Sequence, residues 1–144
     1  MFGLLKKKAT DAVSKYANRT DFLQAVTALS ALVTYADNTA TDAEINATKK
    51  AVKANPSLAA NFDNRTIERT IDDMLDRAAS GRSGRAGLWK EIEDIANDAA
   101  MSEAAILAAL DVAESDGTLG DDERAVLEKA ARLTSVNFAA LLEV

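Results

Sequence analysis

The sequence predicts an all-α fold, a compact bundle of about seven to eight helices that forms a single domain over residues 1–144. Three observations lead to this prediction. Alanine is abundant while β-branched and aromatic runs are missing, apolar residues recur at helical spacing, and proline occurs only once. A hydrophobic content of 48% in 144 residues is enough for one core.

The chain is expected to begin with a helix over residues 4–17, followed by a long helix over residues 20–36. One face of the long helix is apolar, and either Thr20 or Asp21 is its expected N-cap. The residues of that face are Phe22, Leu23, Val26, Leu29 and Val33.

The next helix is expected over residues 41–54, and it ends before Pro56 because a residue that precedes proline disfavours the helical conformation. The turn "PSLAANFD" then leads into a helix over residues 64–80. Its apolar face is formed by Ile67, Ile71, Met74, Leu75 and Ala78. The segment "GRSGR", residues 81–85, is predicted to be an ordinary flexible connection rather than an anion-binding loop, because it lacks the lysine and the spacing of a P-loop.

Three further helices are expected in the second half of the chain, before the closing segment "NFAALLE". They cover residues 86–100, 102–115 and 120–133. Trp89, the only tryptophan, lies at helical spacing from other apolar residues, so we expect it to pack in the core rather than to bind a ligand. Short loops between such helices favour antiparallel packing around one core.

The composition excludes several kinds of chemistry. The chain has no cysteine and no histidine, which excludes thiol nucleophiles, Ser-His-Asp triads and the usual zinc and haem ligands. A bound metal would have to be held by oxygen, so it should be a hard cation such as Ca²⁺ or Mg²⁺. The formal net charge of −6 disfavours binding to nucleic acid and favours a monomer.

The N-terminus has an apolar part (Phe2, Leu4, Leu5) followed by Lys6, Lys7 and Lys8. This segment could touch an anionic membrane surface, but docking of its apolar side on the core is the favoured interpretation. The apolar part is too short for a signal peptide or a transmembrane helix. No stretch of the sequence predicts insertion into a membrane.

An acidic segment is present twice, at an offset of 79 residues, as "YADNTATDAEI" and "ESDGTLGDDER". The second copy does not have the ligand spacing of an EF-hand loop. The superposition pairs Asp37 with Asp116, Asn38 with Gly117, Thr39 with Thr118, Asp42 with Asp121, and Glu44 with Glu123. Because asparagine is the usual substitute for glycine in a left-handed conformation, the two copies are expected to share a backbone shape.

Two interpretations of these turns remain open. In the first, they are helix caps: Thr41 and Glu44 match a capping box, and acidic residues suit the start of a helix. Capping explains Glu123 less well, since Gly120 has no side chain to reciprocate. It explains Asp37 and Asp116 poorly, because a carboxylate is unfavourable near the negative end of a helix. In the second interpretation, a cation is the partner that satisfies these aspartates.

Taken with the "FGLLKKK" start, these turns resemble the tellurite-resistance protein TerB family over essentially the whole chain. The turn 114–117, Glu-Ser-Asp-Gly, is a close match, whereas Tyr35-Ala36-Asp37-Asn38 departs from the family pattern in having Asn38 in place of glycine. The resemblance implies an all-α fold with an internal pseudo-repeat whose two acidic turns lie side by side and bind a divalent cation. The implied metal ligands are Asp37, Glu44, Asp116 and Glu123, with Asp42, Asp121 and Asp122 as secondary ligands.

The resemblance also implies a role in resistance to tellurite and other chemical stress, or in phage defence. It implies a cytoplasmic location, peripheral to the inner membrane, and partners among other tellurite-resistance components such as a TerC-like membrane protein. The leading hypothesis is a non-enzymatic interaction module that binds Ca²⁺ in preference to Mg²⁺. The alternatives are a structural or assembly protein whose acidic turns are only caps and, less favoured, a metal-dependent hydrolase.

Overall fold

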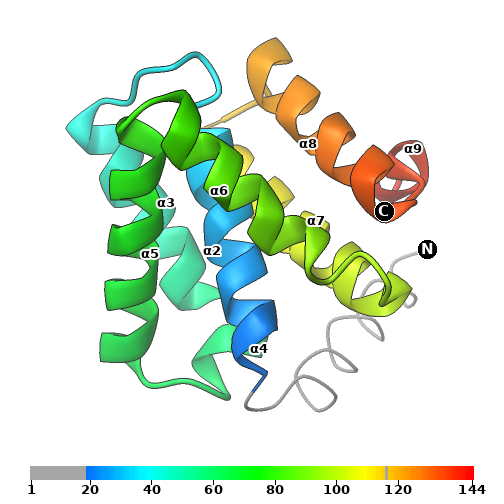
Figure 1. Cartoon of the computed structure of the whole chain (residues 1–144), viewed down its shortest axis with the longest axis horizontal. Helices are drawn as coiled ribbons and strands as arrows, with labels where there is room; N and C mark the ends of the chain where they lie inside the picture. Colours follow the sequence, from blue (N-terminus) through cyan, green and yellow to red (C-terminus); the bar gives the residue numbers. More distant parts are fainter. Residues whose placement is uncertain (1–18, 116) are drawn as a thin grey trace.

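The structure, a computed structural model, describes residues 19–115 and 117–144 and confirms the all-α prediction (Figure 1). This described part of the chain contains eight helices and no strand. They are α2 (Thr20–Thr34), α3 (Asp42–Ala54), α4 (Pro56–Ala59), α5 (Asn64–Ala79), α6 (Arg82–Glu93), α7 (Ala99–Ala113), α8 (Asp121–Thr134) and α9 (Phe138–Leu142). The helix expected over residues 4–17, with the apolar and lysine residues of the N-terminus, lies outside the described residues.

Helix α2 is the centre of the core. It contacts α3, α5, α6, α7 and α8, and Figure 1 shows it between the helices that surround it. Twelve of its 15 residues are buried, three of them hydroxyl residues, so the helix is buried on every side rather than on one face. A helix that is buried on every side lies inside a fold. An amphipathic helix such as α5 instead lies at the surface of the bundle and packs only its apolar face against the core.

The internal repeat is present in the helices themselves. At the offset of 79 residues, the first and last residues of α2 coincide with those of α7, and the first residue of α3 coincides with that of α8. The packing is repeated too, because α3 contacts α7 while α8 contacts α2. The chain therefore contains two related helical hairpins, α2–α3 and α7–α8, which pack against each other.

The prediction of a flexible connection at residues 81–85 is wrong. Helix α6 begins at Arg82, so only Gly81, with a φ of 109°, remains as a turn. A Cβ atom on Gly84 would lie 1.9 Å from the backbone oxygen of Arg77, which shows how closely α6 approaches α5. Glycine is needed at position 84 for this close approach, not for flexibility.

Other helix boundaries also differ from the predictions. The helix expected over residues 86–100 ends at Glu93, and α7 begins after Asp98, whose Oδ1 accepts a hydrogen bond from the backbone N–H of Met101 at 3.0 Å. The segment "PSLAANFD", which was expected to be a turn, begins with the short helix α4, and the preceding Asn55 caps this helix. An acceptor side chain at each of these N-caps determines where the following helix starts.

Neither Thr20 nor Asp21 is the N-cap of α2, because that position is occupied by Arg19. Asp21 instead accepts a hydrogen bond from Arg19 Nη2 at 2.7 Å, and this bond holds the pKa of Asp21 below its ordinary value. Trp89 is partly buried against the core, and the Lys129 Nζ atom lies 4.3 Å from the centre of its ring. No helix in the described ranges is long and apolar enough to cross a membrane.

Candidate functional site

The two acidic turns begin with the same backbone hydrogen bonds, and each has a residue of positive φ at the position that the repeat predicts. Asn38 has a φ of 72°, and its counterpart Gly117 has a φ of 138°. The N–H of Asn38 donates to the carbonyl of Tyr35 at 2.8 Å, and the N–H of Gly117 donates to the carbonyl of Glu114 at 3.2 Å. The hydrogen bonds that close the last turn of α2 recur at the equivalent positions of α7. The ends of α2 and α7 are therefore equivalent, whereas the φ values of Asn38 and Gly117 differ by 66°.

In the first turn, side chains as well as backbone close the loop. The N–H of Glu44 donates to Thr41 Oγ1 at 3.1 Å, and the N–H of Thr41 donates to Glu44 Oε1 at 3.3 Å, so the predicted capping box is present. Asp37 Oδ1 accepts from the N–H of Thr39 at 3.2 Å. Thr39 is therefore a local partner of Asp37, which was not predicted from the sequence.

The second turn has half of a capping box. The N–H of Gly120 donates to Glu123 Oε1 at 2.8 Å, but glycine has no side chain to return the bond. The cap therefore uses one carboxylate oxygen of Glu123, although Gly120 offers no side chain in return. Asp121 and Asp122 follow in the first turn of α8, where the helix dipole favours negative charge.

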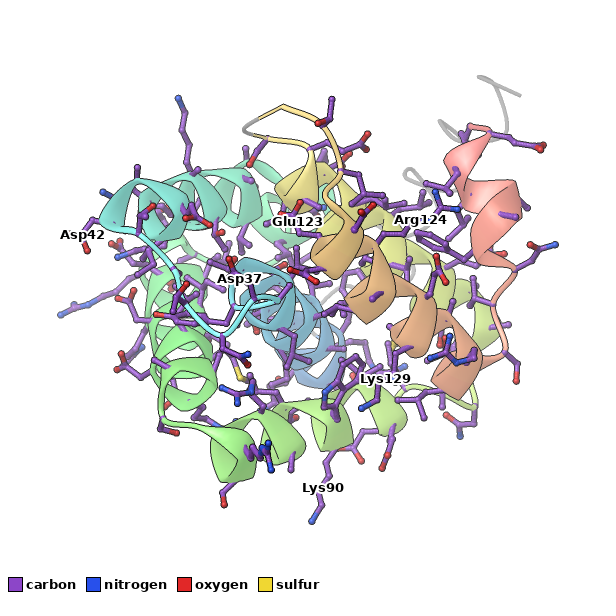
Figure 2. All side chains as sticks on the ribbon, turned by 90° about the horizontal axis from the view of Figure 1, so that it is seen from above. Asp37, Asp42, Lys90, Glu123, Arg124 and Lys129 are labelled. Atoms are coloured by element: carbon purple, nitrogen blue, oxygen red, sulfur yellow. The ribbon has the colours of Figure 1, made fainter. Side chains whose placement is uncertain are left out.

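A cleft of about 380 Å³ lies between the two turns. It is lined by Val33, Thr34, Ala36, Asp37, Glu44, Thr118, Gly120, Asp121, Asp122 and Glu123. Both turns thus contribute carboxylates to one space, and no basic residue is among the described residues that line it. Figure 2 shows Asp37 and Glu123 beside this space, whereas Asp42 lies at the outer end of α3. Asp42 does not line the cleft.

A smaller cavity of about 10 Å³ shares part of its wall with the cleft. Glu44 and Glu123 line both spaces, so one glutamate from each turn is present where they meet. Thr34, Thr48 and Ser115 add three hydroxyl groups to the wall of the small cavity. The small cavity therefore combines two carboxylates with three hydroxyl groups.

The donor set suits a hard cation, because all of its polar side chains are carboxylates and hydroxyls. The local hydrogen bonds of Asp37 and Glu44 use one oxygen of each carboxylate, and neither second oxygen accepts a hydrogen bond within residues 19–115 and 117–144. However, no group of three or more acidic side chains in those ranges is arranged to hold a metal ion. Asp116, the remaining predicted ligand, lies outside the described residues. Binding would thus require the acidic side chains to turn inward.

Sequence reasoning missed the threonines beneath the first turn. Thr34 and Thr48 are buried, and their Oγ1 atoms are 2.6 Å apart. The signal was present in the repeat, since the equivalent positions in the second hairpin are Ala113 and Leu127. The first hairpin has a pair of hydroxyls at the positions where the second hairpin has a pair of apolar residues. The two turns are therefore supported by different contacts.

Comparison with protein families identifies one match. The family model described as "Tellurite resistance protein TerB" matches residues 23–142. This range includes both acidic turns and every described helix except the first three residues of α2. No curated protein sequence and no solved structure matches the chain. The family match agrees with the resemblance that the two turns suggest.

Proposed function

The chain belongs to the TerB family of tellurite resistance proteins, and from that premise we propose that it is a non-enzymatic module that binds a divalent cation between its two acidic turns. The observation that carries the proposal is the shared cleft. Five carboxylates line it, from Asp37 and Glu44 on one side and from residues 121–123 on the other. Carboxylates collected in one space repel one another, and a bound cation would offset this repulsion.

Calcium fits this site better than magnesium. Ca²⁺ accepts about six to eight oxygen ligands in a flexible geometry, whereas Mg²⁺ requires a near-ideal octahedron and retains several waters. An open cleft with carboxylates on two separate turns suits the less demanding ion. Asp37, Glu44, Asp116 and Glu123 would be the main ligands, and Asp121 and Asp122 would add charge from the start of α8.

The cation would act by joining the two hairpins at their acidic turns. Binding would fix α3 and α8 relative to each other and so order the surface around the cleft. The partners we propose for that surface are other tellurite-resistance components, such as a TerC-like membrane protein, which would place this chain in the cytoplasm at the periphery of the inner membrane. The net charge of −6 favours a monomer in this assembly.

Calorimetric titration tests the proposal. Ca²⁺ and Mg²⁺ are titrated separately into the full chain after treatment with a chelator, and the Asp37→Asn/Asp116→Asn variant is titrated beside it. A matched control is Asp73→Asn/Asp76→Asn, which removes the same charge from exposed positions of α5. We expect binding by the wild type and the control and none by the first variant. Absence of binding in the wild type would remove the proposal.

One observation favours a second candidate, a structural protein whose acidic turns are only helix caps. Glu44 and Glu123 both accept hydrogen bonds at the helix starts, and Asp37 has Thr39 as a partner. In that case chelator and Ca²⁺ should leave the melting temperature unchanged, because only a ligand that binds the folded state raises it.

A further inference from the structure

A buried hydrogen bond closes the base of the first acidic turn. Thr34 is the last residue of α2 and Thr48 is in α3, so they flank the turn on the two helices that it connects. Their side-chain oxygens are 2.6 Å apart, and the two residues are only 7% and 4% exposed. Water cannot easily replace this contact.

The direction of the bond follows from its neighbour. Thr34 Oγ1 donates its one proton to the carbonyl of Ser30, at 2.8 Å. A hydroxyl has one proton to donate but two lone pairs to accept with, so Thr48 must donate to Thr34. The chain Thr48 to Thr34 to Ser30 thus links α3 to the backbone of α2, immediately before the turn begins.

Packing of the helix pair does not require these hydroxyls. The second hairpin has equivalent helix boundaries, apart from one extra residue at the end of α8, but has Ala113 and Leu127 at the equivalent positions, both buried. Burial of a hydroxyl is unfavourable unless it is hydrogen-bonded, so an apolar pair is the simpler way to fill such a site. The polar pair beneath the first turn therefore indicates a need for defined geometry rather than for burial alone.

The pair also lies next to the predicted ligands. Thr34 lines the cleft with Asp37 and Glu44, and both threonines line the small cavity with Glu44 and Glu123. Thr48 lies one helical turn after Glu44 on α3, so a change in how α3 is held against α2 moves that carboxylate directly.

We infer that Thr34 and Thr48 are positioning residues of the cation site, whose hydrogen bond fixes the end of α2 and the start of α3, from which Asp37 and Glu44 reach the cation. This inference rests on the proposed function, since it concerns the affinity of the same site. Residues that orient metal ligands from behind typically change affinity by about 10- to 100-fold when they are removed. Since these threonines act through the helices rather than by bonding the ligands, we expect a loss at the lower end of that range.

The test is calorimetric titration of Ca²⁺ into the full chain with Thr48→Val, which removes the hydroxyl while keeping the branched shape. We expect affinity about tenfold weaker than in the wild type. Thr48→Ser restores the hydroxyl and should restore most of the affinity. Thr34→Ala, which copies the alanine of the second hairpin, provides a second variant if Thr48→Val does not fold.

Thr27→Val is the matched control for a purely structural effect. Thr27 is also a buried threonine of α2, and its hydroxyl donates to the carbonyl of Leu23 at 2.7 Å, but it does not line the cleft or the small cavity. It should lower the melting temperature without changing the affinity for Ca²⁺. Wild-type affinity in Thr48→Val and Thr34→Ala would overturn the inference while leaving the proposed function intact. A wild type that binds no cation would instead remove both.

Discussion

Between residues that the structure describes, the first acidic turn is closed by more side-chain hydrogen bonds than the second, although the backbone bonds that end α2 and α7 are equivalent. In the first turn, Thr41 and Glu44 bond reciprocally, Asp37 bonds to Thr39, and a buried threonine pair lies beneath them. In the described part of the second turn, Glu123 caps Gly120 without a returned bond, and Ser115 Oγ donates to the carbonyl of Val112 at 2.6 Å.

In the proposed cation site, this difference would give the two halves different tasks. A turn that is fixed by several side-chain bonds holds its backbone in one arrangement before a ligand arrives, which lowers the entropic cost of binding. A turn that depends on two glycines can adjust its backbone more widely. The comparison therefore predicts a preorganised first half and a more adaptable second half.

The largest expected effect is stabilisation by the cation itself, which requires both turns. At a free Ca²⁺ concentration one hundred times the Kd, the free energy of unfolding should rise by about 2.7 kcal/mol, which corresponds to an increase in Tm of about 5–10 °C. Glu44→Gln and Glu123→Gln should each cancel most of this gain, because glutamine retains an acceptor for the cap but lacks the charge. Thermal melts with Ca²⁺ and with chelator measure it. If only one variant lost the gain, the turns would not share one site.

The next effect concerns the residues with positive φ. Gly117→Asn should destabilise the fold by about 1–3 kcal/mol, because side chains rarely adopt a φ of 138° whatever space surrounds them. Asn38→Gly should change stability by less than about 1 kcal/mol, since either residue accepts a φ of 72°. Urea unfolding of both variants measures this, because a shift of the midpoint with an unchanged dependence of the unfolding free energy on urea reports a change in stability. Equal midpoints would show that the two turns are conformationally equivalent.

A smaller effect is expected from the cap of the first turn. Thr41→Ala removes the side chain that accepts from the N–H of Glu44, and it should cost about 1 kcal/mol of stability. The loss corresponds to a decrease in Tm of about 3–4 °C, which differential scanning calorimetry can resolve. Thr39→Ala, which leaves the capping box intact, is the control. A Tm unchanged by Thr41→Ala would mean that the first turn does not depend on its capping box.

The smallest effect should come from completing the second cap. Gly120 has an extended conformation that any residue can adopt, and an added Cβ would meet only the flexible Glu123 carboxylate, at 3.0 Å. Gly120→Ser should therefore supply the missing half of the capping box and stabilise the fold by a few tenths of a kcal/mol, about 0.3. Differential scanning calorimetry of Gly120→Ser and the wild type measures this gain in stability. Destabilisation would indicate that the second turn needs glycine for a reason other than its φ.

The repeat in the sequence predicted the most about this molecule. It predicted that Asn38 and Gly117 both have a positive φ, and the all-α pattern followed from apolar spacing. Residues 81–85 were predicted wrongly because two close glycines are typical of a loop, and only the tertiary contact between Gly84 and Arg77 explains them. The cleft could be expected only through the family resemblance, since spacing along the chain does not show which two turns meet in space.

The most direct test of the central claim is to count ions per chain by native mass spectrometry, after chelator treatment and addition of Ca²⁺. The account predicts one Ca²⁺ per wild-type chain and none in Glu44→Gln or Glu123→Gln at the same free Ca²⁺ concentration. No ion in the wild type would contradict it. So would two ions in the wild type with one lost in each variant, because each turn would then be a separate site.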